Sequence, residues 1–208
     1  MMASNPFSSR YLEPGAIPFC FRDKQTLDTL AQRFGQWQHS RQSNSLRLAI
    51  VGPHGSGKST LMSHLSRRLD CPLVVLHSST PKWNGLKLVM NSARKQRVFL
   101  VDGYEQLPVW GQVLLLAQSK LHRISLGVTA HRLPRAFELL WETRVDFKVE
   151  TYVIERLLGE VSPQVQSALM GSEAWKVSRS KRGANLRESL FDMYDWWRDT
   201  VDGNSRSR

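Results

Sequence analysis

Residues 52–60, GPHGSGKST, constrain the fold of this chain more than any other segment. They match the pattern G-x-x-x-x-G-K-[ST] and lie between an apolar run, LRLAIV (46–51), and a stretch, 58–69, whose leucines recur at helical spacing. Glycines let a backbone wrap closely around a phosphate chain, and inward-facing amides with a helix N-terminus supply positive potential. A glycine-rich turn without a ligand does not explain the adjoining lysine and serine. The segment therefore predicts a phosphate-binding loop between a strand and a helix.

Every residue of this loop is a candidate nucleotide ligand. The expected binding residues are Gly52, Pro53, His54, Gly55, Ser56, Gly57, Lys58, Ser59 and Thr60. Lys58 is expected to reach the β- and γ-phosphates, Ser59 to bind Mg²⁺ through its hydroxyl, and Thr60 to lie near the α-phosphate. His54 receives no chemical role. The chain contains no [NT]-K-x-D motif for reading guanine, so the expected cofactors are ATP and Mg²⁺.

Short apolar runs alternate with helical patterns through the middle of the chain. We expect strands at 46–51, 72–77, 98–101, 124–129 and 145–150, and helices at 58–69, 82–97, 108–120 and 133–143. Such runs, bounded by turn residues, are typical of an α/β fold in which a parallel sheet has helices on both faces. With the loop, this predicts a P-loop NTPase sheet followed by a small C-terminal helical lid.

The same pattern divides the chain into four expected parts. They are an N-terminal arm and helix (1–45), the nucleotide-binding core (46–150), the lid (151–199) and a disordered tail (200–208). Within the first part, residues 23–38 place apolar side chains at helical spacing, with Asp23 as the expected N-cap.

Two strand ends carry polar side chains that suit phosphate chemistry. Asp102 ends the run VFLV, where an acid on a neighbouring strand of a P-loop protein binds Mg²⁺. Thr129 ends the next run, where its hydroxyl is a candidate for orienting water or touching the γ-phosphate, and His131 is a second candidate for that role. An N-capping carboxylate and ordinary strand-end polarity are the structural alternatives.

The order of these motifs resembles that of AAA+ ATPases. GPHGSGKST looks like Walker A, VFLVD like Walker B, and GVTAH stands at the place of sensor 1. The resemblance implies an arginine finger at Arg144, in LLWETRVDFKV, and a sensor 2 arginine at Arg187, in GANLRESLF. The opening NPFSSRYLEPGAIPF also resembles the leader of small bacterial ATPases that help transposition and secretion. The resemblance to AAA+ ATPases covers residues 5–199 and is most specific at the phosphate-binding loop.

The chain departs from this family at one catalytic position. AAA+ hydrolases carry Asp-Glu at the end of the Walker B strand, and the glutamate polarises water; here Gly103 follows Asp102. Either Glu105 reaches back through a flexible Gly-Tyr turn, or the glutamate function is absent. Loss of the water-orienting group slows turnover and leaves binding largely intact. We expect Glu105 to serve, with slow hydrolysis.

Charge and composition bear on partners and compartment. The net charge is +11, with +10 in residues 1–150 (20 Lys and Arg against 10 Asp and Glu). This excess suggests a polyanionic partner such as DNA, and the basic stretch 82–97 with Trp83 is a candidate contact, although a solvated helix face explains it equally well. A finger at Arg144 requires a homo-oligomer. Two cysteines, no signal peptide and no long apolar run predict a cytoplasmic protein without a membrane partner.

Two further functions fit parts of the sequence. VDGYEQL also resembles the strand end of P-loop kinases for small molecules, and 131–137 offers arginines for a phosphate lid. The charge excess and Gly103 also fit a nucleotide-gated DNA-binding module with little hydrolysis, and a protein partner is a further alternative. We favour an AAA+-like ATPase whose nucleotide state drives a conformational or assembly switch.

Overall fold

The computed structural model describes residues 5–22, 26–39, 45–159 and 163–202. These residues form two compact units. The sheet unit is made of Asp23–Gly52 and Leu61–Thr143, and the helical unit is made of Met1–Arg22, Pro53–Thr60 and Arg144–Arg208. The expected N-cap Asp23 and residues 203–208 of the expected tail lie outside the described residues, and 200–202 belong to a short terminal helix.

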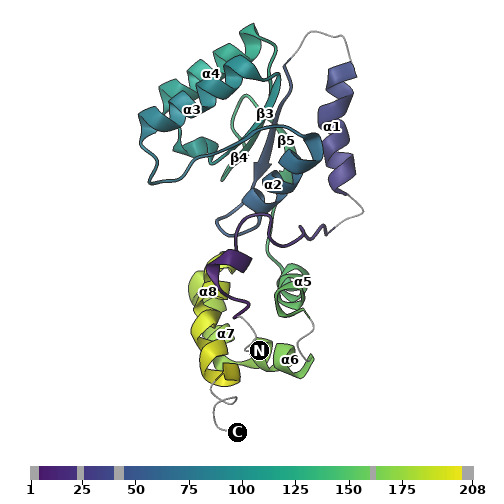
Figure 1. Cartoon of the computed structure of the whole chain (residues 1–208), viewed down its shortest axis with the longest axis vertical. Coiled ribbons are helices and arrows are strands. Elements are labelled where there is room, and N and C mark those ends of the chain that lie inside the picture. The colour runs from purple at the N-terminus through teal and green to yellow at the C-terminus, as the bar shows by residue number, and fades with distance from the viewer. Residues whose placement is uncertain (1–4, 23–25, 40–44, 160–162, 203–208) are drawn as a thin grey trace. The chain divides into compact units, whose positions relative to one another are not determined.

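The sheet unit contains a five-stranded sheet in the order β2-β3-β4-β1-β5, and every neighbouring pair is parallel (Figure 1). Its strands are β1 (Arg47–Val51), β2 (Leu73–Val75), β3 (Val98–Asp102), β4 (Ser125–Ala130) and β5 (Glu138–Glu142). Its helices are α1 (Leu27–His39), α3 (Lys82–Lys95), the one-turn 3-10 helix η2 (Tyr104–Gln106) and α4 (Val109–Leu121), while α2 (Lys58–Leu69) begins in the phosphate loop and continues into this unit. The predicted fold class is confirmed.

Both faces of the sheet are buried, which explains why its strands read as continuous apolar runs. Successive side chains of a strand point to opposite faces. Ala49, Phe99 and Val128 therefore share one face, where they pack in a cluster with Leu86 of α3 and Leu115 of α4.

The opposite face of the sheet receives α1. A Cβ at Gly127 of β4 would lie 2.9 Å from the Phe34 ring and would also collide with Leu100. Glycine at this position therefore gives the buried Phe34 room to lie directly on the strand.

The expectation for residues 133–150 is wrong in both of its elements. The predicted helix 133–143 contains the strand β5, and the predicted strand 145–150 contains the start of helix α5 (Phe147–Leu158). Leu133, Phe137 and Trp141 recur at helical spacing, but pairing with the edge of β1 overrides that local preference.

The second error has a different cause. Val145, Phe147 and Val149 alternate like a strand, yet the carboxylate of Asp146 accepts a hydrogen bond from the Val149 amide at 3.0 Å. This is N-cap chemistry, and it starts a helix where the apolar alternation suggests a strand.

The helical unit has its own apolar core. Its elements are the 3-10 turn η1 (Ser9–Tyr11), α5, α6 (Pro163–Gly171), α7 (Glu173–Arg182), α8 (Leu186–Trp197) and the π-helical turn η3 (Arg198–Asp202). Phe7 of the N-terminal arm is fully buried and meets the Trp197 ring edge-on, with 6.0 Å between centroids. Leu12 of the arm is buried in the same cluster, so the arm is part of this core. No helix in the described residues is long and apolar enough to cross a membrane.

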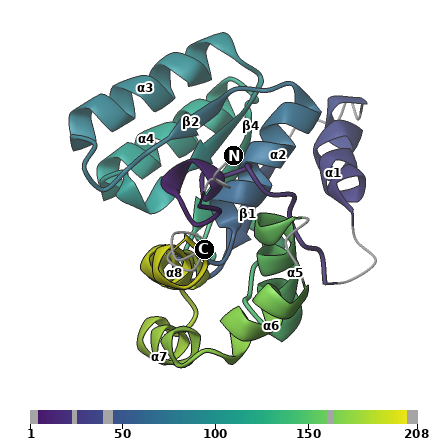
Figure 2. The same cartoon turned by 60° about the horizontal axis from the view of Figure 1, so that its bottom comes forward.

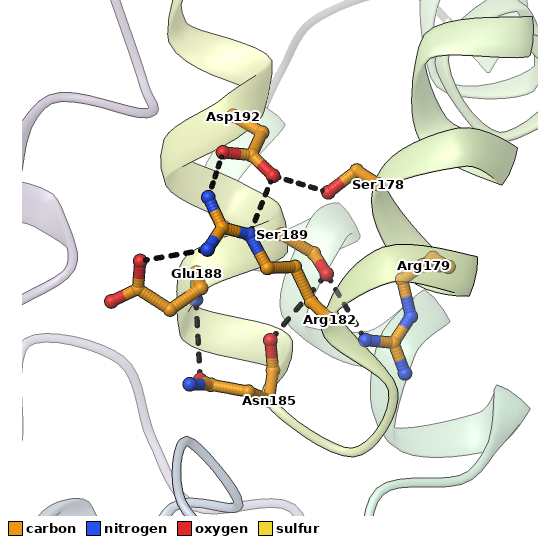
Figure 3. A network of polar contacts seen from close by, with 7 residues as sticks. All are labelled: Ser178, Arg179, Arg182, Asn185, Glu188, Ser189 and Asp192. Carbon is orange, nitrogen blue, oxygen red and sulfur yellow. Dashed lines mark hydrogen bonds and ion pairs between the residues drawn. The ribbon is translucent and has the colours of Figure 1, made fainter.

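A polar network joins α7 to α8 (Figure 3). Arg182 Nη2 lies 2.8 Å from Asp192 Oδ1, Arg182 Nε donates to Asp192 Oδ2 at 3.0 Å, and the Ser178 hydroxyl donates to Asp192 at 2.8 Å. Beside it, Arg179 donates to the Ser189 hydroxyl at 3.1 Å and forms an ion pair with Glu150 of α5. Bidentate pairing fixes the two helices in one register.

We expect Asp192→Asn to destabilise the chain at neutral pH, where its carboxylate accepts from Arg182. That hydrogen bond is the main cause that lowers the pKa of Asp192 below its ordinary value of 3.8, with Ser178 also contributing. A depressed pKa stabilises the fold above the ordinary value, and the stabilisation is lost as the pH falls through the lower folded value. Thermal unfolding should show a Tm lowered by a few degrees at neutral pH, and the gap to the wild type should close in acid.

Asp195→Asn is the matched control, because Asp195 lies on the same helix in an exposed pair with Arg198. Its effect on Tm should be smaller. Equal effects of the two substitutions would contradict a structural role for the network.

Candidate nucleotide-binding site

The phosphate loop keeps its own lysine inside its turn. Lys58 is 8% exposed, and its Nζ donates to the Pro53 carbonyl at 2.6 Å. The Ser56 hydroxyl donates to the same oxygen at 2.8 Å. Gly55 and Gly57 hold φ angles of +67° and +92°, which glycine adopts without strain. The loop is therefore closed around one carbonyl, with a buried ammonium group at its centre.

Helix α2 begins at Lys58, so Ser59 and Thr60 lie in its first turn. Both are half-buried, and this turn carries no acidic side chain. The positive end of the helix is thus uncompensated by its own first turn, which suits an anion. His54 is exposed within the loop.

The loop packs against the C-terminal helices and the N-terminal arm of the helical unit. A Cβ at Gly55 would collide with the Asn185 side chain and would lie 3.1 Å from the Arg187 backbone nitrogen. A Cβ at Gly57 would lie 3.2 Å from the Phe19 ring. The glycines are therefore required by the neighbouring chain as well as by the curvature of the loop.

Arg187 lies in the first turn of α8, two positions after the N-cap Asn185. Its side chain is exposed, and its guanidinium lies over the Phe191 ring at 5.5 Å from the centroid. The structure thus places the start of α8, with this arginine, beside the phosphate loop. Asn185 was not a predicted site residue, although Asn185 with Glu188 three positions later is a visible N-cap pattern.

At the edge of the sheet, Thr129 holds Asp102. The Thr129 hydroxyl donates to Asp102 Oδ1 at 2.6 Å and accepts from the Gly103 amide at 2.8 Å. Thr129 is buried, and its single proton is used by Asp102 in this arrangement. The geometry therefore favours positioning of the Asp102 carboxylate as the role of Thr129.

Gly103 turns the chain so that Glu105 returns to this edge. It adopts a left-handed conformation, φ +82° and ψ +40°, and η2 follows at once. A Cβ here would lie 2.5 Å from the Leu76 carbonyl oxygen, so the turn has no room for a side chain. The absence of glutamate at this position is explained by the turn itself.

Glu105 meets His131 beyond the end of β4. Its Oε1 lies 3.1 Å from His131 Nε2, and the other ring nitrogen, Nδ1, lies 3.3 Å from the Gly52 carbonyl. The second carboxylate oxygen, Oε2, is buried and has no hydrogen-bond partner among the described residues. This oxygen therefore keeps its lone pairs available to accept a hydrogen bond.

The His131 contacts limit where protons can be. A carbonyl oxygen and a carboxylate oxygen are both acceptors. Both contacts are satisfied when each ring nitrogen of His131 carries a proton. The contact with Glu105 is also satisfied when the carboxyl group carries the shared proton. The pair can therefore hold one proton at the strand edge.

Arg144 lies between β5 and α5, with an exposed side chain. Among the described residues, no group of three His, Cys, Asp or Glu side chains is placed to hold a metal ion. Ser59 and Asp102, the metal ligands predicted from sequence, belong to the helical unit and the sheet unit respectively, and their binding of Mg²⁺ stays a prediction.

Solved structures share this fold. A RuvB variant of Thermotoga maritima aligns with a TM-score of 0.59 and 16% identity, covering 94% of this chain and 68% of that one. The Thermotoga maritima RuvB Holliday junction branch migration motor aligns with a TM-score of 0.54 and 16% identity, covering 88% and 64%. Replication initiator DnaA, bound to AMPPCP and single-stranded DNA, aligns with a TM-score of 0.54 and 12% identity, covering 97% and 69%.

These likenesses extend over most of this chain and about two thirds of each neighbour. At such low identities they show the fold. No protein-family model matches the chain, and no curated protein matches it by sequence. The narrower resemblance to transposition and secretion-helper ATPases stays a prediction.

We expect Gly103→Ala to destabilise the chain by about 2 kcal/mol, because alanine is strained at positive φ and its Cβ would collide with the Leu76 carbonyl. Urea unfolding measures the change. The control is Gly171→Ala, which lies in helix α6 with nothing within 4 Å of the added Cβ and should be neutral or stabilising. If Gly103→Ala is as stable as the wild type, the turn does have room for a side chain at this position, which contradicts the argument from the Leu76 carbonyl.

Proposed function

We propose that this chain binds ATP with Mg²⁺ as an AAA+-like ATPase, hydrolyses it slowly, and uses nucleotide state to drive a conformational or assembly switch. The observation that carries the proposal is the closed glycine loop between β1 and α2, with the buried Lys58 ammonium group at its centre. The solved structures that share the fold include RuvB, a Holliday junction branch migration motor, and the replication initiator DnaA bound to AMPPCP.

The residues present fit a magnesium nucleotide. The loop offers glycine curvature, a lysine and a helix N-terminus to the phosphates. Ser59 and Asp102 offer the hydroxyl and carboxylate oxygens that Mg²⁺ prefers, and Glu105 Oε2 is a buried acceptor that needs a donor. When bound, the metal ion neutralises charge that develops on the phosphate oxygens.

We assign the binding roles accordingly. Backbone amides of the loop 52–60, other than that of Pro53, which has no N–H, hold the phosphate chain with Lys58, and Thr60 lies near the α-phosphate. Lys58 exchanges its bond with the Pro53 carbonyl for a phosphate oxygen. Thr129 fixes the Asp102 carboxylate in one orientation, since its hydroxyl donates to Oδ1.

The Glu105–His131 pair would supply the base. Glu105 Oε2 accepts a proton from the attacking water, while His131 holds Oε1 and fixes the carboxylate plane. Because His131 also contacts the Gly52 carbonyl at the first residue of the loop motif, it ties the base to the end of β1. Glu105 is separated from the strand end at Asp102 by Gly103 and Tyr104. We propose slow hydrolysis because the base does not follow the strand end directly.

The C-terminal helices would read the nucleotide. The Arg187 backbone nitrogen would lie 3.1 Å from a Cβ at Gly55, so a γ-phosphate in the loop would lie within reach of its guanidinium. Arg144 would act on the nucleotide of a neighbouring subunit in a homo-oligomer. DNA is the proposed polyanionic partner: the DnaA neighbour is bound to single-stranded DNA, and residues 1–150 of this chain carry a net charge of +10.

We expect Lys58→Ala to weaken ATP binding about 10- to 100-fold, because a charge-assisted hydrogen bond to phosphate is lost. Titration with a fluorescent ATP analogue and Mg²⁺ measures the Kd. Lys176→Ala is the control, since Lys176 is an exposed lysine of α7, and its affinity should be that of the wild type. Unchanged binding by Lys58→Ala would remove the central claim.

We expect Glu105→Gln to keep ATP affinity and to lower kcat about 100-fold or more, because the general base is lost. His131→Ala should lower kcat about 10-fold, since the carboxylate is then misplaced, and His131→Gln should recover part of that loss by donating to Oε1. Phosphate release with Mg²⁺ measures each. Wild-type kcat in Glu105→Gln would exclude Glu105 as the base, and ATP binding without any phosphate release by the wild type would favour a switch without hydrolysis.

A further inference from the structure

Helix α4 is apolar on two opposite faces, although only one of them contacts the sheet. Its inner face buries Gly111, Leu115 and Ser119. Its outer face carries the exposed side chains Trp110, Val113, Leu114, Ala117 and Leu121. These follow the spacing i, i+3, i+4, i+7 and i+11, so they form one stripe along the helix. A helix that is hydrophobic all round is normally buried, so the outer stripe indicates a surface that is covered when the protein works.

Trp83 extends the stripe from α4 onto the neighbouring helix. Helices α3 and α4 contact each other on the same face of the sheet and lie side by side in both views (Figures 1 and 2). Trp83 of α3 is 70% exposed and Trp110 of α4 is 52% exposed. Their rings stand edge to face with 5.1 Å between centroids. Exposed tryptophan pairs are unusual on a free surface and common at the centre of protein interfaces.

The charge beside the stripe has one sign. The outer face of α3 exposes Lys87, Arg94 and Lys95. Neither α3 nor α4 contains an aspartate or glutamate, and α4 adds Lys120. A row of cations on one helix thus runs beside a row of apolar side chains on the next. A binding partner that is complementary to this surface has a row of apolar side chains with a row of acidic side chains beside it.

We propose that this surface, the α3–α4 face, docks an acidic amphipathic helix of a partner protein. We define the face by Trp83, Lys87, Trp110, Leu114 and Leu121. The stripe spans eleven residue steps of α4, which is about 16 Å and matches three turns of a partner helix. The apolar side of that helix covers the stripe, and its glutamates or aspartates face the lysines of α3. This role goes beyond the nucleotide chemistry proposed above.

The same observations disfavour three other binding partners of this face: a second copy of the chain, nucleic acid and a lipid bilayer. A second copy packed symmetrically would bring two cationic α3 faces together in a chain of net charge +11. Nucleic acid offers phosphates and bases, which leave Val113, Leu114 and Leu121 without apolar partners. In a bilayer the charged layer lies outside the apolar layer, whereas here the two rows lie next to each other on adjacent helices.

The test uses a fluorescein-labelled helical peptide of about 18 residues, with leucines at i, i+3, i+4, i+7 and i+11 and glutamates beside them. Fluorescence anisotropy measures its binding to the full chain. We expect micromolar affinity for the peptide. The same peptide with scrambled apolar positions, or with lysine in place of glutamate, should bind at least about 10-fold more weakly.

Matched variants locate the contact. Trp110→Ala should weaken binding about 30-fold and Leu114→Ala about 10-fold. Leu139→Ala is the control for the second, because Leu139 on β5 is 43% exposed and Leu114 is 40% exposed. Lys87→Glu should weaken binding in a salt-dependent way, while Lys176→Glu on α7 should not. ATP affinity and Tm should be unchanged in all, which separates this proposal from the nucleotide site.

Several results would overturn the proposal. One is no peptide binding up to about 1 mM. Others are equal binding of the scrambled peptide, and equal effects of Leu114→Ala and Leu139→Ala. Self-association that Trp110→Ala abolishes would assign the face to a second copy. Trp110-dependent binding of single-stranded DNA, or of phosphatidylglycerol vesicles, in place of the peptide would assign it to nucleic acid or to lipid.

Discussion

The functional architecture depends on the parallel register of three neighbouring strands. In β4, Thr129 pairs with Ile50 of β1, and Val128 pairs with Val101 of β3. Because parallel strands end at the same edge, the residues that follow them meet there without any long connection. The Thr129 hydroxyl joins Asp102 to the Gly103 amide at this edge, and His131 joins Glu105 to the Gly52 carbonyl. The ends of three strands are thereby joined by a few polar contacts.

Sequence patterns predicted the repetitive part of this architecture and missed what depends on contacts between distant segments. The phosphate loop and four of the five strands follow from local apolar runs and glycine spacing. The strand β5 does not, because Leu133, Phe137 and Trp141 recur at helical spacing across this segment and pairing with β1 selects the extended form of 138–142. The start of α5 depends on one hydrogen bond from Val149 to Asp146, which apolar alternation obscured.

The candidate site shows the same division. The residues of the loop and Asp102 could be proposed as ligands from sequence, because the chemistry of phosphate and Mg²⁺ demands such residues at fixed spacing, and their roles stay predictions. The reason for glycine at 103 could not, since the Leu76 carbonyl that excludes a side chain comes from another strand end. The contact of Asn185 with Gly55 joins residues 130 positions apart, and no local pattern reports such a distance.

That last contact has a mechanical consequence. Asn185 is at once the neighbour of Gly55 and the N-cap of α8, where its side chain accepts from the Glu188 amide at 3.3 Å. The side chain that limits the space beside Gly55 is therefore held at the end of a helix by its own hydrogen bond. Since Arg182 and Asp192 bind α7 to α8, the residue that limits the space beside Gly55 belongs to a pair of helices joined to each other.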